Sequence, residues 1–119
     1  MSWDVEVTDE FTAWWKTLDE DEQESVATIV QLLRAKGPVL PFPHSSDVRG
    51  SRHGMRELRI QHIGKPYRVL YAFDPRRVAI LLLGGTKAGD DRWYEKNVPA
   101  ADALYESHLE ELRSEGEIE

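Results

Sequence analysis

The chain has 119 residues, of which 40% are hydrophobic and 31% are charged. Its length predicts one domain over residues 1–119, and no apolar run approaches the roughly 18 residues that a membrane span needs. Cysteine is absent, which excludes disulfides, thiol nucleophiles and cysteine-based zinc sites. The first residues lack the basic and apolar stretches of a secretory signal. We therefore expect a cytoplasmic protein with no membrane partner.

The net charge of −7 is distributed very unevenly along the chain. Residues 1–47 and residues 90–119 each carry three basic and ten acidic side chains, a net charge of −7 for each segment. Residues 48–89 carry nine basic and two acidic side chains, a net charge of +7. A basic centre between acidic flanks indicates a face that binds a polyanion. Basic side chains on an ordinary solvated surface are the alternative.

The first half of the chain predicts a strand, two helices and a loop. Residues 3–7 alternate apolar and acidic side chains, which is typical of a half-buried strand. Residues 8–36 predict a helical hairpin, because apolar residues recur at helical spacing and Asp19 with Glu22 forms a capping box for the second helix. Residues 37–54 hold three prolines and three glycines and predict a loop.

The second half predicts an antiparallel meander followed by helices. The expected strands are residues 55–62, 67–73 and 78–83, joined by turns at 64–66 and 74–77. A flexible glycine-rich segment, a short helix and a C-terminal helix are expected at residues 84–89, 91–96 and 99–115. The fold class is α+β: an N-terminal strand and helical hairpin, an antiparallel strand meander and a C-terminal helix. We expect the helices on one face of the sheet, with the basic side chains on the open face.

Several kinds of chemistry find no support in the residues. The four histidines form none of the closely spaced pairs that bind metal ions. The run Gly84-Gly85-Thr86-Lys87 lacks the glycine spacing of a Walker A phosphate loop. No nucleophile elbow is present, and we therefore expect neither a metal nor a cofactor.

A group of charged and aromatic residues remains on and after the meander. Arg59 and Arg68 lie on strands joined by a short turn, and Lys87 follows the third strand, so these cations can rim one anion-binding concavity. Guanidinium groups suit phosphate, and an exposed aromatic side chain can stack on an unpaired base. In the alternative, Arg59 and Arg68 pair with Glu57 and Asp74 on a solvated sheet face. The full group is Arg56, Glu57, Arg59, Arg68, Lys87 and Tyr94.

The order of these motifs resembles the RelE/ParE toxin superfamily, and most closely its HigB-like, phage-derived branch. The resemblance is carried by Met55-Arg56-Glu57-Leu58-Arg59, a glycine turn, Tyr67-Arg68-Val69-Leu70-Tyr71, an apolar strand and Gly85-Thr86-Lys87. It implies a RelE/ParE-like fold and the toxin of a type II toxin–antitoxin module. The implied activity is metal-free cleavage of mRNA on the translating ribosome, by attack of a 2′-hydroxyl on the adjacent phosphorus. The implied partners are mRNA, the ribosome and a cognate helix-turn-helix antitoxin.

The resemblance also implies roles for individual residues. The catalytic residues would be Arg68, which supports the scissile phosphate, with Arg59, Lys87 and an aromatic side chain that is either Tyr94 or Trp93. Three side chains are candidates for proton transfer: Glu57, His53 and His62. Further RNA contacts are expected from Arg49, Arg52, Arg56, Lys65 and Trp93.

The chain departs from the family pattern in two respects. Ribosome-dependent members are basic overall, whereas this chain has a net charge of −7. Glu57 also stands where the family has a lysine on the first meander strand. Other members of the superfamily act on gyrase with the same fold, and fold does not decide activity. A gyrase inhibitor of the same fold and a non-catalytic antitoxin-binding module are therefore alternatives.

Overall fold

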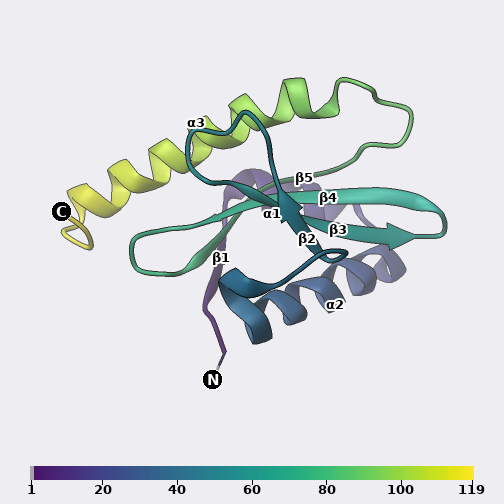
Figure 1. Ribbon diagram of the computed structural model, residues 1–119, viewed down its shortest axis with the longest axis horizontal. Helices are drawn as coiled ribbons and strands as arrows, with labels where there is room; N and C mark the ends of the chain where they lie inside the picture. Colours follow the sequence, from purple (N-terminus) through teal and green to yellow (C-terminus); the bar gives the residue numbers. More distant parts are fainter. Residues whose placement is uncertain (1) are drawn as a thin grey trace.

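The computed structural model describes residues 2–119 (Figure 1). Its elements are β1 (Val5–Val7), α1 (Asp9–Thr17), α2 (Glu20–Lys36), the 3-10 helix η1 (Gly37–Val39), β2 (Ser45–Asp47), β3 (Arg56–His62), β4 (Lys65–Phe73), β5 (Ala79–Thr86) and α3 (Trp93–Ser114). The strands form one mixed sheet in the order β1-β5-β4-β3-β2, in which β1 runs parallel to β5 and the other neighbours are antiparallel. The α+β fold and the central meander are therefore confirmed.

The helical hairpin is also confirmed, with the caps that the sequence predicts. The Asp19 carboxylate accepts a hydrogen bond of 2.8 Å from the Glu22 backbone N–H, and the Glu22 carboxylate accepts one of 2.9 Å from the Asp19 N–H. This reciprocal pair satisfies two N–H groups that a helix start leaves unpaired. The helix ends at Gly37, whose φ of 62° is easily adopted by glycine.

Helices cover both faces of the sheet, so the expectation of a single helical face is wrong. α1 and α2 pack against one face, through core residues that include Leu58, Val69 and Leu81. α3 crosses the opposite face and covers Leu70 and Leu82 (Figure 1). The reason lies in β4 and β5, where apolar residues occupy both sets of alternating positions. Both faces of these strands must therefore be buried.

α3 is one continuous helix, where the sequence predicts a short helix and a second one starting at Pro99. Proline is common in the first turn of a helix, and for this reason the sequence predicts a helix that begins at Pro99. The buried residues Trp93, Val98, Ala101 and Tyr105 share one stripe along α3, and its contact with the sheet extends the helix two turns earlier. Charged side chains recur throughout α3, and nowhere in residues 2–119 does a helix offer the apolar length that crossing a bilayer requires.

Two hairpin turns and one short strand complete the sheet. The turn between β3 and β4 consists of Ile63 and Gly64, whose φ values of 49° and 75° are those of a tight two-residue hairpin turn. The expected turn at residues 64–66 is therefore displaced, because Lys65 and Pro66 already belong to β4. The turn at 74–77 is confirmed by a 2.8 Å hydrogen bond from the Arg77 N–H to the Asp74 carbonyl. β2 lies inside the segment expected to be a loop.

The glycines after the apolar run belong to β5, although the sequence suggests a flexible segment. They permit close contact with tryptophan rings that belong to different helices. A Cβ on Gly84 would lie 2.2 Å from the Trp14 ring, and one on Gly85 would lie 2.8 Å from Trp93 Nε1. Both distances are shorter than a side chain tolerates, so glycine at these positions is required by packing on the strand.

Candidate functional site

The centre of the candidate site is the carboxylate of Glu57, on β3. The side chain is buried, and each of its oxygens has two polar neighbours. Oε2 accepts hydrogen bonds from Ser46 Oγ at 2.7 Å and from Arg59 Nη1 at 3.1 Å. Oε1 accepts one from Tyr94 Oη at 2.5 Å and lies 3.5 Å from Arg68 Nε. Residues from β2, β3, β4 and α3 therefore meet at one carboxylate.

Two arginines flank this carboxylate from adjacent strands. Arg59 and Arg68 are direct partners in the antiparallel β3–β4 ladder. The Arg59 side chain is 30% exposed, whereas the Arg68 side chain is 6% exposed. Arg68 Nη1 donates a 2.9 Å hydrogen bond to the Tyr67 carbonyl, and within residues 2–119 its buried Nε donates to no acceptor.

Of the two interpretations of the arginines that the sequence left open, the structure confirms part of the ion-pair alternative, and the binding of an anion stays a prediction. The arginines do pair with Glu57, as the solvated-face alternative supposed, but the pairing is buried. The expectation that Arg68 lies on an open face is wrong, because α3 covers that face. Burying charge is costly unless opposite charges and hydrogen bonds compensate for lost water, as Glu57 does here. The alternative also supposed a pair with Asp74. Within the described residues Asp74 binds Arg76 and His108 instead.

The first turn of α3 brings Tyr94 to the site and excludes Trp93. The Tyr94 hydroxyl binds Glu57, and Lys87 Nζ lies 5.2 Å from the centre of the Tyr94 ring. Burial and the hydrogen bond to Glu57 raise the pKa of Tyr94, although the charge of Arg68 acts in the opposite direction. Trp93 is buried against Gly85 and belongs to the core beneath α3. Of the two aromatic candidates, only Tyr94 reaches the carboxylate.

The two candidate histidines lie outside this cluster. His53 Nε2 is 2.8 Å from the Glu106 carboxylate, on the middle of α3. Glu106 follows Tyr94 by twelve residues, which is about 18 Å along a helix. His62 Nδ1 is 2.8 Å from Ser25 Oγ, on the face covered by α2. Neither imidazole is positioned beside the Glu57 carboxylate.

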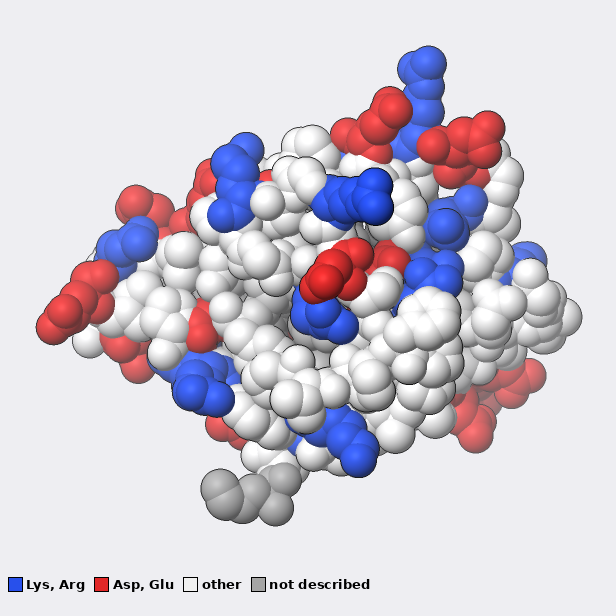
Figure 2. All heavy atoms as spheres, viewed as in Figure 1, with Lys and Arg blue, Asp and Glu red and all other residues white. Residues whose placement is uncertain are grey.

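Several cations expected to bind RNA are already paired with acids. Arg52 binds Glu106 at 2.6 Å. Arg56 binds Asp47 at 2.5 Å and projects to the sheet face opposite to that of Arg59. Among the residues described, Arg49, Lys65 and Lys87 take part in no ion pair. Figure 2 shows basic side chains around acidic ones in the middle of one face, with further acidic and basic side chains toward its edge.

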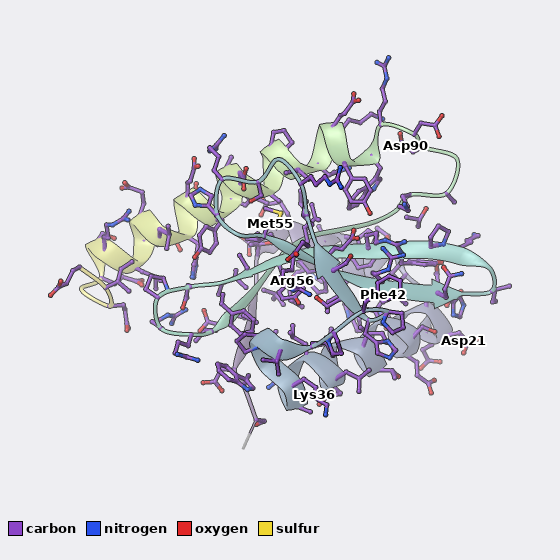
Figure 3. The ribbon with its side chains drawn as sticks, viewed as in Figure 1. Asp21, Lys36, Phe42, Met55, Arg56 and Asp90 are labelled. Atoms are coloured by element: carbon purple, nitrogen blue, oxygen red, sulfur yellow. The ribbon has the colours of Figure 1, made fainter. Side chains whose placement is uncertain are left out.

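Two residues of the site could not be identified from sequence patterns. Ser46 reaches Glu57 because β2 pairs with β3, with Ser46 opposite Glu57 in the register. Phe42 lies beside β3 (Figure 3), with the Arg59 guanidinium carbon 5.1 Å from its ring centre. Both come from the segment expected to be a loop. The only available signal was a pair of serines and one aromatic residue between prolines.

Comparisons with known proteins agree with this architecture. The model of the family described as "Phage derived protein Gp49-like" matches residues 13–106. Two relatives from Mycobacterium tuberculosis are named "Putative toxin HigB2" and "Putative toxin HigB3". The first is 40% identical over 92% of this chain, and the second is 46% identical over 81% of it. The chain spans 55% of the length of HigB2 and 84% of the length of HigB3.

Solved structures show the same fold at low sequence identity. A mutant of the Escherichia coli toxin RelE in the free state has a TM-score of 0.60 and 12% identity, over 80% of this chain and 94% of RelE. The RelE–RelB complex of Pyrococcus horikoshii has a chain with a TM-score of 0.52 and 15% identity, over 75% of this chain and 99% of that one. The chain therefore has the fold of RelE, is similar to the two proteins named HigB, and belongs to the Gp49-like family of phage-derived proteins.

Proposed function

We propose that this chain is the toxin of a type II toxin–antitoxin pair and that it cleaves mRNA on the translating ribosome. The observation that carries the proposal is the convergence of Arg59, Arg68 and Tyr94 on the buried carboxylate of Glu57. This cluster combines positive charge for a phosphate with a group that can accept a proton. The names of the two mycobacterial relatives, "Putative toxin HigB2" and "Putative toxin HigB3", add support from sequence similarity.

The proposed reaction is an internal transesterification of RNA. The 2′-hydroxyl oxygen attacks the adjacent phosphorus, and the bond from phosphorus to the 5′ oxygen of the next nucleotide breaks. The products are a 2′,3′-cyclic phosphate and a free 5′-hydroxyl. The 2′-hydroxyl proton passes to a base on the protein, and the leaving oxygen takes up a proton. No nucleophile on the protein is required.

Charge stabilisation is assigned to the two arginines in different ways. Arg59 is partly exposed and can donate directly to the phosphate oxygens. Arg68 is buried, and it adds its positive charge from beneath the carboxylate. Fixed charges that face the developing negative charge can contribute several kcal/mol to the rate, because they need no reorganisation during the reaction. Lys87, beside the Tyr94 ring, adds a third cation at the rim.

Glu57 is the proposed proton acceptor, because its carboxylate lies among these groups while His53 and His62 bind elsewhere. Tyr94 is proposed to orient Glu57 and the substrate. A phenol is protonated at neutral pH, and burial and the hydrogen bond to Glu57 raise the pKa of Tyr94 further, so it serves as a hydrogen-bond donor. The proposed partner that restrains the toxin is a helix-turn-helix antitoxin encoded beside it.

Induction of the protein alone tests the proposal. Growth arrest that is relieved by the adjacent antitoxin, together with new mRNA 5′ ends inside coding regions, is the expected result. DNA supercoiling is measured in the same cells. Relaxed DNA with intact mRNA would indicate the gyrase inhibitor instead. Normal growth at high expression of folded protein would indicate a binding module without catalysis.

A further inference from the structure

Phe42 is an exposed aromatic residue on a firmly anchored segment. Its side chain lies on the surface, and the residue is 68% exposed. On one side of it Leu40 is buried in the core, and on the other Ser45 is completely buried. The Ser45 N–H binds the Pro41 carbonyl at 3.1 Å, and the Arg59 N–H binds the His44 carbonyl at 2.9 Å. The backbone is thus fixed while the ring faces solvent.

The position of this ring connects it to the candidate site. The Arg59 guanidinium lies over the ring at 5.1 Å and also donates to Glu57. Single exposed hydrophobic residues are common and need no explanation by themselves. Phe42 differs because an anchored backbone, an exposed ring and a bridging arginine occur together beside a buried carboxylate. Ordering this segment on ligand binding would cost little entropy, because the fold has already ordered it.

We infer that Phe42 is a stacking platform for an unpaired nucleobase of the RNA strand, next to the phosphate that Arg59 binds. This inference rests on the proposed function and adds the group that holds the base. An aromatic ring accepts the flat face of any base, and a guanidinium beside it can contact both base and phosphate.

A second aromatic and cation pair lies on the other side of the carboxylate. Glu57 Oε2 faces Arg59 and its Phe42 ring, whereas Oε1 faces Tyr94 and its neighbour Lys87. The two nucleotides that flank a cleaved phosphate would each find one ring. Holding them on separate rings unstacks them from each other, which frees the 2′-hydroxyl for in-line attack.

RNA binding tests the platform independently of cleavage. The probe is a fluorescein-labelled octamer of adenylate, compared with octamers in which one interior base at a time is replaced by an abasic ribose. Loss of the stacked base should weaken binding by wild-type protein about tenfold at one position. Phe42→Leu should bind the intact octamer about tenfold more weakly and show no further loss at that position, while Phe42→Tyr should resemble wild type.

Val39→Ala provides the matched control, because Val39 is 76% exposed, three residues before Phe42, but has no ring on which a base could stack. It should bind every octamer as wild type does, and circular dichroism should show all variants folded. The platform is refuted if wild-type protein binds intact and abasic octamers equally, or if Phe42→Leu weakens both to the same extent. A Phe42-dependent difference between intact and abasic octamers, without any mRNA cleavage, would refute the ribonuclease activity alone. Cleavage without this difference would refute the platform alone.

Discussion

Arg59 and Arg68 lie directly opposite each other on adjacent antiparallel strands, and both pair with one carboxylate, that of Glu57, which leaves the three groups with a net charge of +1. Like charges in this position ordinarily destabilise a sheet. Here the two guanidinium groups contact different oxygens of the same carboxylate, at 3.1 and 3.5 Å. The arrangement keeps a buried positive charge, Arg68, next to a partly exposed one, Arg59, and fixed positive charges of this kind can stabilise the negative charge of a phosphorane.

Replacing Arg68 should affect both cleavage and stability. Arg68→Ala removes a buried positive charge, so we expect no detectable mRNA cleavage and a loss of about 1–3 kcal/mol in the free energy of unfolding. Arg68→Lys keeps the charge without the planar fork that holds it between the Tyr67 carbonyl and the Glu57 carboxylate, and it should recover most of the stability but little of the cleavage. Thermal unfolding and mapping of mRNA 5′ ends measure the two effects. Full cleavage by Arg68→Lys would contradict a role for the guanidinium geometry.

Replacing Glu57 by glutamine should remove the proton acceptor and also the negative charge that compensates Arg59 and Arg68, so circular dichroism must first show that the variant is folded. Loss of a general base typically slows a reaction by about 10²–10⁴-fold, and we expect Glu57→Gln to lose cleavage in this range. Ser46→Ala is the control, because it deletes one hydrogen bond to the carboxylate and leaves the carboxylate itself. The control should retain most of its activity. The measurement is the single-turnover cleavage rate of each variant. A fully active Glu57→Gln would show that another group is the general base.

Lys87 should contribute one phosphate contact to RNA binding. Each contact adds about −0.7 to the slope of log affinity against log salt for single strands, so Lys87→Ala should flatten that slope by roughly this amount. Lys96→Ala is the control, since Lys96 is exposed on α3 and pairs with Asp90 at 3.2 Å. It should leave the slope unchanged. Titrations of a labelled octamer between low and moderate salt provide the measurement, and equal slopes for both variants would exclude Lys87 from the interface.

Asp74 should make the stability of the protein depend on pH in the acid range. Burial alone would raise the pKa of Asp74, but hydrogen bonds from Arg76, His108 and the Val78 N–H outweigh burial and hold the pKa below its ordinary value of 3.8. The unfolded chain therefore takes up a proton at higher pH than the folded one. The stability from this group is complete above its unfolded pKa and is lost as pH falls through the folded value.

Asp74→Asn removes that contribution. We expect a loss of about 2–3 kcal/mol at pH 7, with the two proteins converging in acid. Denaturant unfolding between pH 2.5 and 7, a range chosen to bracket the carboxylate titration, measures the difference. Glu110→Gln, a change of an exposed carboxylate on α3, should leave the profile unaltered. A constant difference between Asp74→Asn and wild type at every pH would show that the Asp74 charge is not responsible.

Local patterns in the sequence predicted the helical hairpin and the meander, because caps, alternation and turn residues act over a few positions. Pro99 shows the limit of such signals, since burial of Trp93 extended α3 beyond the start that proline favours. Register across a short turn was enough to bring Arg59 and Arg68 together. Ser46 and Phe42 were not predictable, because their positions depend on the pairing of a three-residue strand with β3.

The ion pairs of Glu57 with Arg59 and Arg68 also determine which anions bind the protein weakly. A carboxylate that belongs to the chain competes for the arginines at a high effective concentration, whereas free phosphate or nucleotides must bind from dilute solution. Small anions should therefore be poor inhibitors of the free protein. A nucleic acid can overcome this competition because it binds through several weak contacts at once. The site therefore favours a polymer over a small anion, whatever the sequence of the polymer.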